Sequence, residues 1–365
     1  MSYLSNALVA CETLQGRLED FWQVTDANGA DENMPLAQFL ANPVNRRGIE
    51  TQILPPGQGK KRRVRVTYSQ RLTEDTVEED GTNPVCEASN EYGNLSTDYE
   101  MPDGNLVSSE KVTLDNLKDF CEDNNTYFLS RLAAHIDVIE RKVATQWTDE
   151  AVLLAGKWGA LGQPDSLFQS GTASGQVNGS DEYVWKTRLS GGNIDPEAWW
   201  DLRFALNKIG YGGNVALIGG STAFKYFGAT QVGCCADSGI DVANAMASYG
   251  YGVAYDKRLT AALGSENKLM AFVPGSIVPL VYRENEIKDG IPLINYNGAN
   301  TVWTTVFTRR LGLPVDLTIN VPCGKDVHMG VAVGTKLIAL PTDQFATNDP
   351  YFGKNGVNKI TITNP

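Results

Sequence analysis

The stretch NTYFLSRLAAHIDVIERKVATQW, residues 125–147, carries the longest helical signal in this sequence. Large apolar side chains recur in it at spacings of four and three residues, the periodicity of one face of an α-helix; they are Phe128, Leu132, Ile136, Ile139, Val143 and Trp147. Extended from Leu114 to Leu154, the helix would be about 60 Å long at roughly 1.5 Å per residue. The run EDNN at 122–125 could break or bend it. The sequence therefore predicts a long helix with one apolar face.

Upstream of this helix lies a segment with charges of both signs, KKRRVRVTYSQRLTEDTVEEDG, residues 60–81. Val64, Val66 and Tyr68 alternate with basic or polar residues, which is the period of a β-strand with one apolar face. Residues 74–100 are polar and rich in turn formers, and residues 105–112 could form the returning strand. The pattern predicts a β-ribbon with a basic stem and an acidic tip. A ribbon without a packed partner is unusual inside a compact domain.

Shorter elements are expected on either side. An amphipathic helix is predicted at residues 6–22, a helical turn at Pro35–Leu40 and one strand within 41–59. This N-terminal region has little core of its own. Beyond the long helix, a mixed α/β region is predicted at 191–300, and strands dominate from residue 301. Before residue 301 we expect a strand near Tyr183–Leu189, a helix from Asp195 to Gly210, a strand at 215–219 and a helix capped by Ser221. After it, the expected strands are TVWTTVF, VDLTINVP, VHMGVAV, KLIALP and KITIT.

Composition narrows the classes of function. The chain has 365 residues and a net charge of -12, with a pI near 4.8, so phosphate repels it and generic nucleic-acid binding is disfavoured. No apolar run reaches the roughly 18–20 residues that span a bilayer, and the first residues lack a basic leader. The 6 cysteines are too scattered for a disulfide framework, and the 2 histidines leave few candidates for general-base chemistry.

No catalytic, cofactor or metal site is predicted from the motifs. Gly219-Gly220-Ser221 could bind an anion at a helix N-terminus, but it lacks a phosphate-binding lysine, and a tight turn is favoured. His135 and the Asp326/His328 pair could act as acid and base, but no nucleophile motif accompanies them, so structural roles are favoured. The acidic run at 74–80 lacks the spacing of a calcium loop and is better explained as a solvated or partner-facing surface.

The order of these elements resembles the major capsid proteins of tailed bacteriophages, with the Hong Kong 97-like fold. The segments that carry the resemblance are VTYSQRLTEDTVEEDGTNPVC for an extended loop, DNLKDFCEDNNTYFLSRLAAHIDVIERKVATQW for a spine helix, IDPEAWWDLRFALNKIGYGGNVALIGGSTAFKYF for the start of an axial domain, and YDKRL with LMAFVPGSIVPLVY for its later part. The resemblance implies an α+β fold with an N-terminal arm at 1–55, an extended β-hairpin loop at 56–110, a spine helix and peripheral domain at 111–190, an axial domain at 191–305, and peripheral return strands with the C-terminus at 306–365.

The resemblance also implies a function. It implies self-assembly into hexamers and pentamers of an icosahedral shell around double-stranded DNA, without sequence-specific binding, inside a virion built in the host cytoplasm. Portal and scaffolding proteins would be partners, and a decoration protein is a further candidate. A neighbouring subunit would cover the apolar face of the ribbon and meet its charges with opposite ones. The candidate inter-subunit contacts are Lys60, Lys61, Arg62, Arg63, Arg65, Tyr68, Glu74, Asp75, Glu78, Glu79 and Asp80.

Three other functions stay open at this point. Scattered tryptophans, tyrosines and acids could form the sugar cleft of a carbohydrate-active or other hydrolase with a carboxylate site. A cellular, encapsulin-like compartment shell would share the same physical features as a capsid. A DNA-binding accessory protein could use the basic run at 60–65. Particle size, enclosed cargo and salt-sensitive DNA binding would distinguish them.

Overall fold

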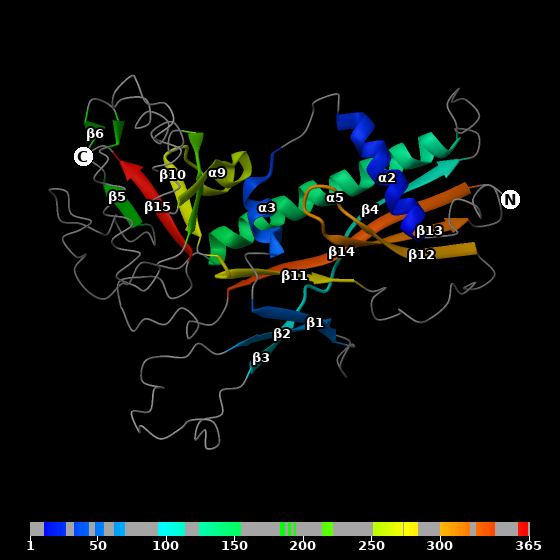
Figure 1. Ribbon diagram of the computed structural model, residues 1–365, viewed down its shortest axis with the longest axis horizontal. Helices are drawn as coiled ribbons and strands as arrows, with labels where there is room; N and C mark the ends of the chain where they lie inside the picture. Colours follow the sequence, from blue (N-terminus) through cyan, green and yellow to red (C-terminus); the bar gives the residue numbers. More distant parts are fainter. Residues whose placement is uncertain are drawn as a thin grey trace, which may run out of the picture.

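The computed structural model describes most of the helices and strands on which the prediction depends (Figure 1). The described residues are 11–26, 33–43, 48–54, 62–69, 94–113, 124–154, 183–186, 189–190, 193–194, 214–221, 251–272, 274–283, 300–321, 326–339 and 357–363. Within them the strands form two larger sheets, a three-stranded sheet and a short two-stranded pair, β6 (Leu189–Ser190) with β7 (Asn193–Ile194). No helix in this part of the chain is long and apolar enough to cross a membrane.

The main sheet is built around one long strand, β14 (Asp326–Ala339). On one side β14 pairs with β13 (Pro314–Val321), which in turn pairs with β12 (Asn300–Phe307). Two further strands pair with successive parts of β14: β4 (Leu106–Thr113) with its first half and β11 (Ile277–Tyr282) with its second. The sequence split β14 into two runs, VHMGVAV and KLIALP, but Gly334 and Thr335 continue the same strand.

Helix α5 (Asn124–Leu154) lies across this sheet and confirms the central prediction (Figure 1). The apolar stripe faces the sheet: Leu132, Ile136, Ile139, Val143 and Trp147 are all buried. Trp147 Nε1 donates a hydrogen bond of 2.6 Å to Thr335 Oγ1, which donates in turn to Leu280 O, so the helix is tied to β14 and β11. The helix begins inside EDNN, where the break was expected; residues 114–123 lie outside the described part.

Two N-terminal helices pack beside α5. Helix α2 (Cys11–Asp26) buries Leu14, Leu18 and Trp22, and α3 (Pro35–Ala41) buries Leu36 and Leu40; all five side chains join the core cluster that contains the α5 stripe. The described part of the first helix starts later than predicted, since residues 1–10 are not described. The N-terminal region therefore completes the core of the main sheet, consistent with its having little core of its own.

The second larger sheet lies at one end of α5 (Figure 1). Its order is β5 (Tyr183–Lys186), β15 (Val357–Thr363), β10 (Lys268–Phe272), β8 (Val215–Gly219) and β9 (Tyr251–Tyr255). Helix α9 (Lys257–Leu263) packs on it and contacts α5. Asp256 caps α9 by accepting from the backbone of Arg258 and Leu259, and it also accepts from Leu36 N over 3.1 Å, which links α3 to this sheet. The helix expected at 195–210 lies outside the described residues.

Strand β15 differs from expectation. The sequence placed KITIT among the return strands of the peripheral domain, together with the strands that follow residue 305. In the structure β15 pairs antiparallel with β10 and parallel with β5, so the last strand belongs to the second sheet. The alternation of apolar and polar residues in KITIT is compatible with either sheet, and only pairing with distant strands determines which sheet it joins.

The remaining three strands form the ribbon sheet, β1–β2–β3, where β1 is Ile49–Leu54, β2 is Arg63–Ser69 and β3 is Asn94–Glu100. The prediction of strands within 41–59 and at 63–68 is confirmed. The returning strand was wrongly assigned: β3 pairs with β2, whereas residues 106–113 form β4 in the main sheet. The sequence NLSTDYE of β3 is mostly polar because only one of its faces touches the protein, so it was taken as part of a turn-rich region.

Candidate assembly interface

The inner face of the ribbon sheet is covered by its own chain. Val64, Val66 and Tyr68 are buried in one apolar cluster with Met101. The cluster is completed from β11 and β14 of the same chain by Val278, Leu280, Tyr282 and Ile338. Tyr68 is only 4% exposed. The expectation that a neighbouring subunit covers this apolar face is therefore wrong, because β11 and β14 of the same chain already cover it.

The outer face of the ribbon carries a charge pair within the chain. Arg65 and Asp98 are directly opposite each other on β2 and β3, and the guanidinium binds the carboxylate at two points, over 2.7 and 3.2 Å. Arg63 adds a weaker contact, with 3.9 Å between Nη1 and Asp98 Oδ2. The hydrogen bond from Arg65 holds the pKa of Asp98 below its ordinary value. Asp98 on β3 of the same chain therefore supplies the opposite charge that a neighbour was expected to supply to Arg65.

Arg62 fixes the base of the ribbon. Its guanidinium donates a hydrogen bond to Asn105 Oδ1 and lies 5.2 Å from the centre of the Tyr282 ring, a cation–π distance. The backbone carbonyl of Arg62 accepts from Met101 N over 2.9 Å. These contacts hold the start of β2 beside the segment that leads into β4.

The structure gathers four of the predicted contact residues and does not describe the others. Arg62, Arg63, Arg65 and Tyr68 all lie on or next to β2. The rest of the basic stem and the whole acidic tip fall outside the described residues; these are Lys60, Lys61, Glu74, Asp75, Glu78, Glu79 and Asp80. Their role as contacts remains a prediction.

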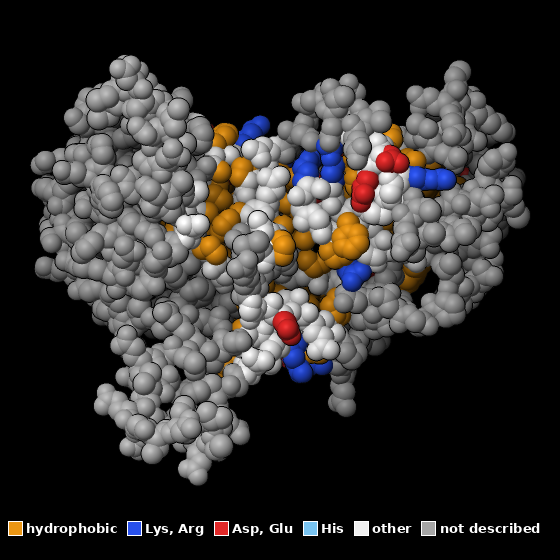
Figure 2. All heavy atoms as spheres, in the orientation of Figure 1, with side chains coloured by type: hydrophobic (Ala, Val, Ile, Leu, Met, Phe, Trp, Pro, Cys, Tyr) orange, Lys and Arg blue, Asp and Glu red, His pale blue; other side chains and the backbone are white. Residues whose placement is uncertain are grey.

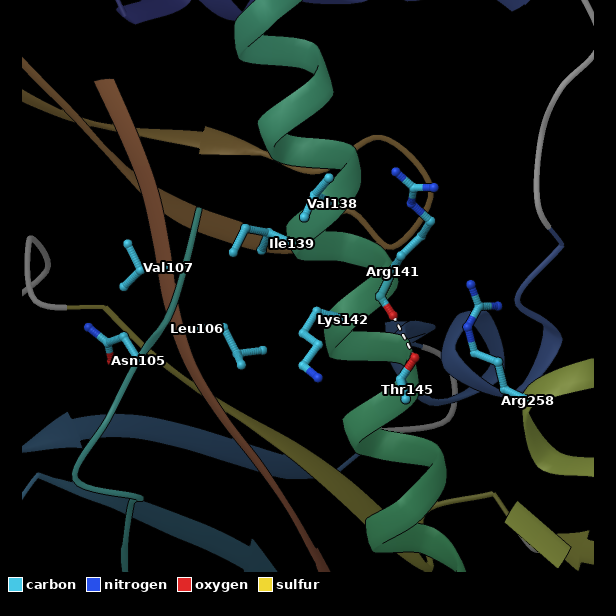
Figure 3. A pocket seen from close by; sticks show the side chains of 9 residues that line it. All are labelled: Asn105, Leu106, Val107, Val138, Ile139, Arg141, Lys142, Thr145 and Arg258. Carbon is cyan, nitrogen blue, oxygen red and sulfur yellow. Dashed lines mark hydrogen bonds between the residues drawn. The ribbon is translucent and has the colours of Figure 1, made fainter. Parts of the chain in front are cut away.

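A feature that the sequence did not reveal is an open groove of about 750 Å³ across the outer face of α5 (Figure 3). One side is the start of β4 and the other includes Arg258 from α9. The residues that line it are Asn105, Leu106, Val107, Val138, Ile139, Arg141, Lys142, Thr145 and Arg258. Helical spacing does place Val138, Arg141, Lys142 and Thr145 on one face, opposite the buried stripe, but the contributions of β4 and α9 depend on tertiary packing.

His135 belongs to a polar cluster between α5 and β4. Ser108 Oγ lies 2.7 Å from its Nδ1, and its Nε2 lies 3.0 Å from Glu110 Oε2. Arg131 Nε donates to the same carboxylate oxygen over 2.9 Å. Burial opposes ionisation of Glu110, but the hydrogen bonds from Arg131 and His135 outweigh it and hold the pKa of Glu110 below its ordinary value. These hydrogen bonds all run between α5 and β4, so the cluster joins helix to strand.

The other polar motifs have local partners. A Cβ at Gly219 would collide with Leu269 of β10, and a Cβ at Gly220 with Glu266, so the two glycines allow close approach of the chain at the start of β10. The backbone N–H of Ser221 donates to the Glu266 carboxylate over 2.7 Å, which occupies the position where an external anion was considered. Asp326 pairs with Lys111 over 2.8 Å, while His328 is exposed. Among the described residues no three His, Cys, Asp or Glu side chains gather as a metal site would require.

Comparison with known proteins gives structural likenesses only. No protein-family model matches the chain, and no curated protein matches its sequence significantly. The capsid asymmetric unit of cyanophage A-1(L) is 12% identical over 92% of this chain and 94% of that one, with a TM-score of 0.46. The capsid of the Myoviridae phage XM1 is 11% identical over 92% and 94%, with a TM-score of 0.41. The capsid of a native GTA particle is 10% identical over 92% of both chains, with a TM-score of 0.39. These TM-scores are low, so the likenesses by themselves assign no function to this chain.

Proposed function

We propose that this chain is a major capsid protein of a tailed bacteriophage, with a Hong Kong 97-like α+β fold, that assembles into hexamers and pentamers of an icosahedral shell around double-stranded DNA. The observation that carries the proposal is the arrangement of α5. This helix runs along the main sheet, the ribbon sheet lies on β11 beside it, and a second α/β sheet lies at its end (Figure 1). The resemblance of the sequence implied an N-terminal arm, an extended β-hairpin loop, a spine helix, a peripheral domain and an axial domain, and the arrangement around α5 supports that organisation.

The ribbon supports assembly through its loop. Strands β2 and β3 end together at the pair Ser69↔Asn94, and residues 70–93 connect them. The acidic tip at 74–80 belongs to this connection, while the stem beside it is basic. Opposite charges on neighbouring copies would fix register and partner, and buried apolar area would supply most of the affinity. Repeated over a closed shell, weak contacts add up to a stable container.

The charge of the chain fits a container for DNA. A net charge of -12 would disfavour strong adhesion of the shell to the DNA that it encloses. The role proposed is structural and non-enzymatic. A portal and a scaffolding protein would complete the particle, with a decoration protein as a further candidate. The particle would form in the host cytoplasm and become the virion capsid.

The contact residues and domain bounds are part of the proposal. We keep the basic stem and the acidic tip as inter-subunit contacts and remove Tyr68, because its side chain is buried within its own chain. Arg65 would contact a neighbour while still bound to Asp98, as a shared charge. The domain bounds stay as stated above, with β4 and β15 reassigned to the main and second sheets.

The size and form of the purified protein test this function. We expect closed particles of megadalton mass, by light scattering and electron microscopy, from the chain alone or co-expressed with its scaffolding protein. An enzyme of this length would instead elute as a small oligomer, and a chain that stays small under both conditions would refute the proposal. Particles that hold a protein cargo in place of DNA would indicate a cellular compartment shell.

A further inference from the structure

We propose that Ser108 is a nucleophilic serine that accepts an acyl group from an ester, with His135 as its general base and Glu110 as the carboxylate that orients the imidazole. The sequence favoured a structural role for His135 because no nucleophile motif accompanies it. In the structure the nucleophile comes from β4, 27 residues before the histidine. This reactivity goes beyond the proposed shell function and does not depend on it.

The hydroxyl and the imidazole lie at the separation that a nucleophile and its base require. Ser108 Oγ is 2.7 Å from Nδ1 of His135, and Nε2 of the same ring is 3.0 Å from Oε2 of Glu110. Ser108 and Glu110 are two residues apart on β4, so both side chains lie on the same side of the strand and the ring bridges them. The two ring nitrogens are used the other way round from serine proteases, but either nitrogen can accept a proton when the other carries one.

Glu110 determines the direction in which these hydrogen bonds run. Despite burial, the hydrogen bonds from Arg131 and His135 hold the pKa of Glu110 below its ordinary value, so the carboxylate is ionised near neutral pH. An ionised carboxylate can only accept, so Nε2 of neutral His135 carries the proton and Nδ1 is left as an acceptor. The hydroxyl of Ser108 must then donate to Nδ1, which is the direction that general-base activation needs.

The acyl donor would approach along the groove across α5. Leu106, which lies two residues before Ser108 on the same side of β4, lines this groove (Figure 3). Val138 and Ile139, one helical turn beyond His135, line it from α5. The side chains of Ser108 and His135 are half-buried at the end of this apolar surface, so both are partly open to a ligand. The apolar lining favours an ester with an aliphatic acyl chain.

The transfer needs no oxidant, reductant or further reactant. Ser108 Oγ attacks the carbonyl carbon of the ester while Nδ1 of His135 takes the proton of the hydroxyl. The bond between the carbonyl carbon and the alcohol oxygen then breaks, and His135 returns the proton to the leaving alcohol. The products are one acylated Ser108 per chain and one free alcohol.

Labelling of the full chain with an alkyl fluorophosphonate tests the nucleophile. The reagent transfers its phosphonyl group to activated serines with loss of fluoride, and peptide mass spectrometry locates the label. Ser109 is the internal control, because it is exposed and lies on the opposite side of β4. We expect Ser108 to be labelled about 100-fold faster than Ser109, which is the effect of a positioned general base. With p-nitrophenyl octanoate, the octanoyl group should appear on Ser108.

Substitutions assign the roles within the cluster. His135→Gln should lower the labelling rate of Ser108 about 100-fold, and Glu110→Gln should lower it at least about tenfold, because an amide can donate to Nε2 and favour the wrong tautomer. Ser109→Ala should leave it unchanged. The charged groups of the cluster are Glu110 and Arg131. In the wild type the rate should rise between about pH 5 and pH 8, where histidine ordinarily loses its proton.

Equal labelling of Ser108 and Ser109 in the wild type would overturn the assignment, and this comparison does not depend on the folding of any variant. Labelling of Ser108 that persists in folded His135→Gln, with thermal melting as the check of folding, would overturn it as well. Electron microscopy of the same samples separates this failure from failure of the function. Particles without the label refute the reactive serine alone, whereas a labelled chain without particles supports the serine and counts against the shell.

Discussion

The carboxylate of Glu140 is fully buried and holds the turn between β12 and β13. Its Oε1 accepts from the backbone N–H groups of Arg310 and Leu311, each over 2.7 Å, and Arg310 Nη1 lies 3.8 Å from Oε2. Glu140→Ala would leave two backbone donors without their acceptor and a guanidinium without its nearby charge. We expect a loss of about 3 kcal/mol in the free energy of unfolding, measured by chemical denaturation.

Glu140→Gln is the matched control, because an amide oxygen can still accept from both N–H groups. It should lose clearly less stability than Glu140→Ala. If the two variants are equally unstable, the hydrogen bonds to the turn are not what Glu140 contributes.

The carboxylates of buried Glu140 and half-buried Glu110 should give opposite pH dependences of stability. Burial raises the pKa of Glu140 above its ordinary value, so the folded state holds this proton when the unfolded state has lost it, and Glu140 contributes less stability as pH rises through the raised pKa. The pKa of Glu110 is held below the ordinary 4.5, so its contribution is present above that value and lost as pH falls through the lowered pKa.

Urea denaturation between about pH 3 and pH 8 measures both effects, by comparing the wild type with Glu140→Gln and Glu110→Gln. The free energy of unfolding of Glu140→Gln should rise relative to that of the wild type as pH rises. That of Glu110→Gln should rise relative to the wild type as pH falls. Parallel pH profiles for the two variants and the wild type would show that neither group is perturbed.

Helix α5 is the element on which the core depends, and proline substitution tests it. Ile136 is fully buried near the middle of the helix. Ile136→Pro removes a backbone hydrogen bond and clashes with the preceding turn, so we expect a loss of about 3 kcal/mol or more, or failure to fold. Ile136→Val keeps the backbone and should cost only about 0.5–1.5 kcal/mol. Thermal or chemical unfolding measures both, and equal losses would mean that packing alone accounts for the effect.

The sequence predicted the elements whose signal is local. The buried stripe of α5, the alternation of β2 and the apolar run of β8 each follow from periodicity within a few residues. The pairing of β3 with β2 and of β4 with β14 could not be predicted, because both partners are chosen by contacts between distant segments.

The same limit applies to single side chains. Glutamate is rarely fully buried, and the sequence does not mark Glu140 as an exception. Its burial depends on the turn between β12 and β13, whose backbone N–H groups donate to the carboxylate. In the candidate interface, the sequence identified the charges of the ribbon. It could not show that Asp98 neutralises Arg65, or that α5, β4 and α9 together form a groove.

At the scale of the whole molecule, the strands of the ribbon pack on their own chain, and the proposed assembly uses the loop between β2 and β3. The ribbon is held to β11 by its own apolar cluster, so the fold does not need a neighbour to cover β2. Ser69 and Asn94 are directly paired, which is the geometry that a two-residue Asn-Gly turn can close. Residues 70–93 can therefore be replaced by Asn-Gly without disturbing the strand register.

We expect this shortened chain to remain folded and to form no shell. Loop closure costs about 0.6 kcal/mol for each doubling of length, so the shorter turn should stabilise the ribbon by up to roughly 2 kcal/mol and leave Tm unchanged or higher. Circular dichroism and thermal melting test the fold, and light scattering with electron microscopy tests assembly. A matched control replaces 70–93 with a Gly/Ser linker of equal length, which keeps the span but removes the acids, and it should also fail to assemble. Normal particles from either variant would show that the shell is held together by other surfaces, because the tip would then be dispensable.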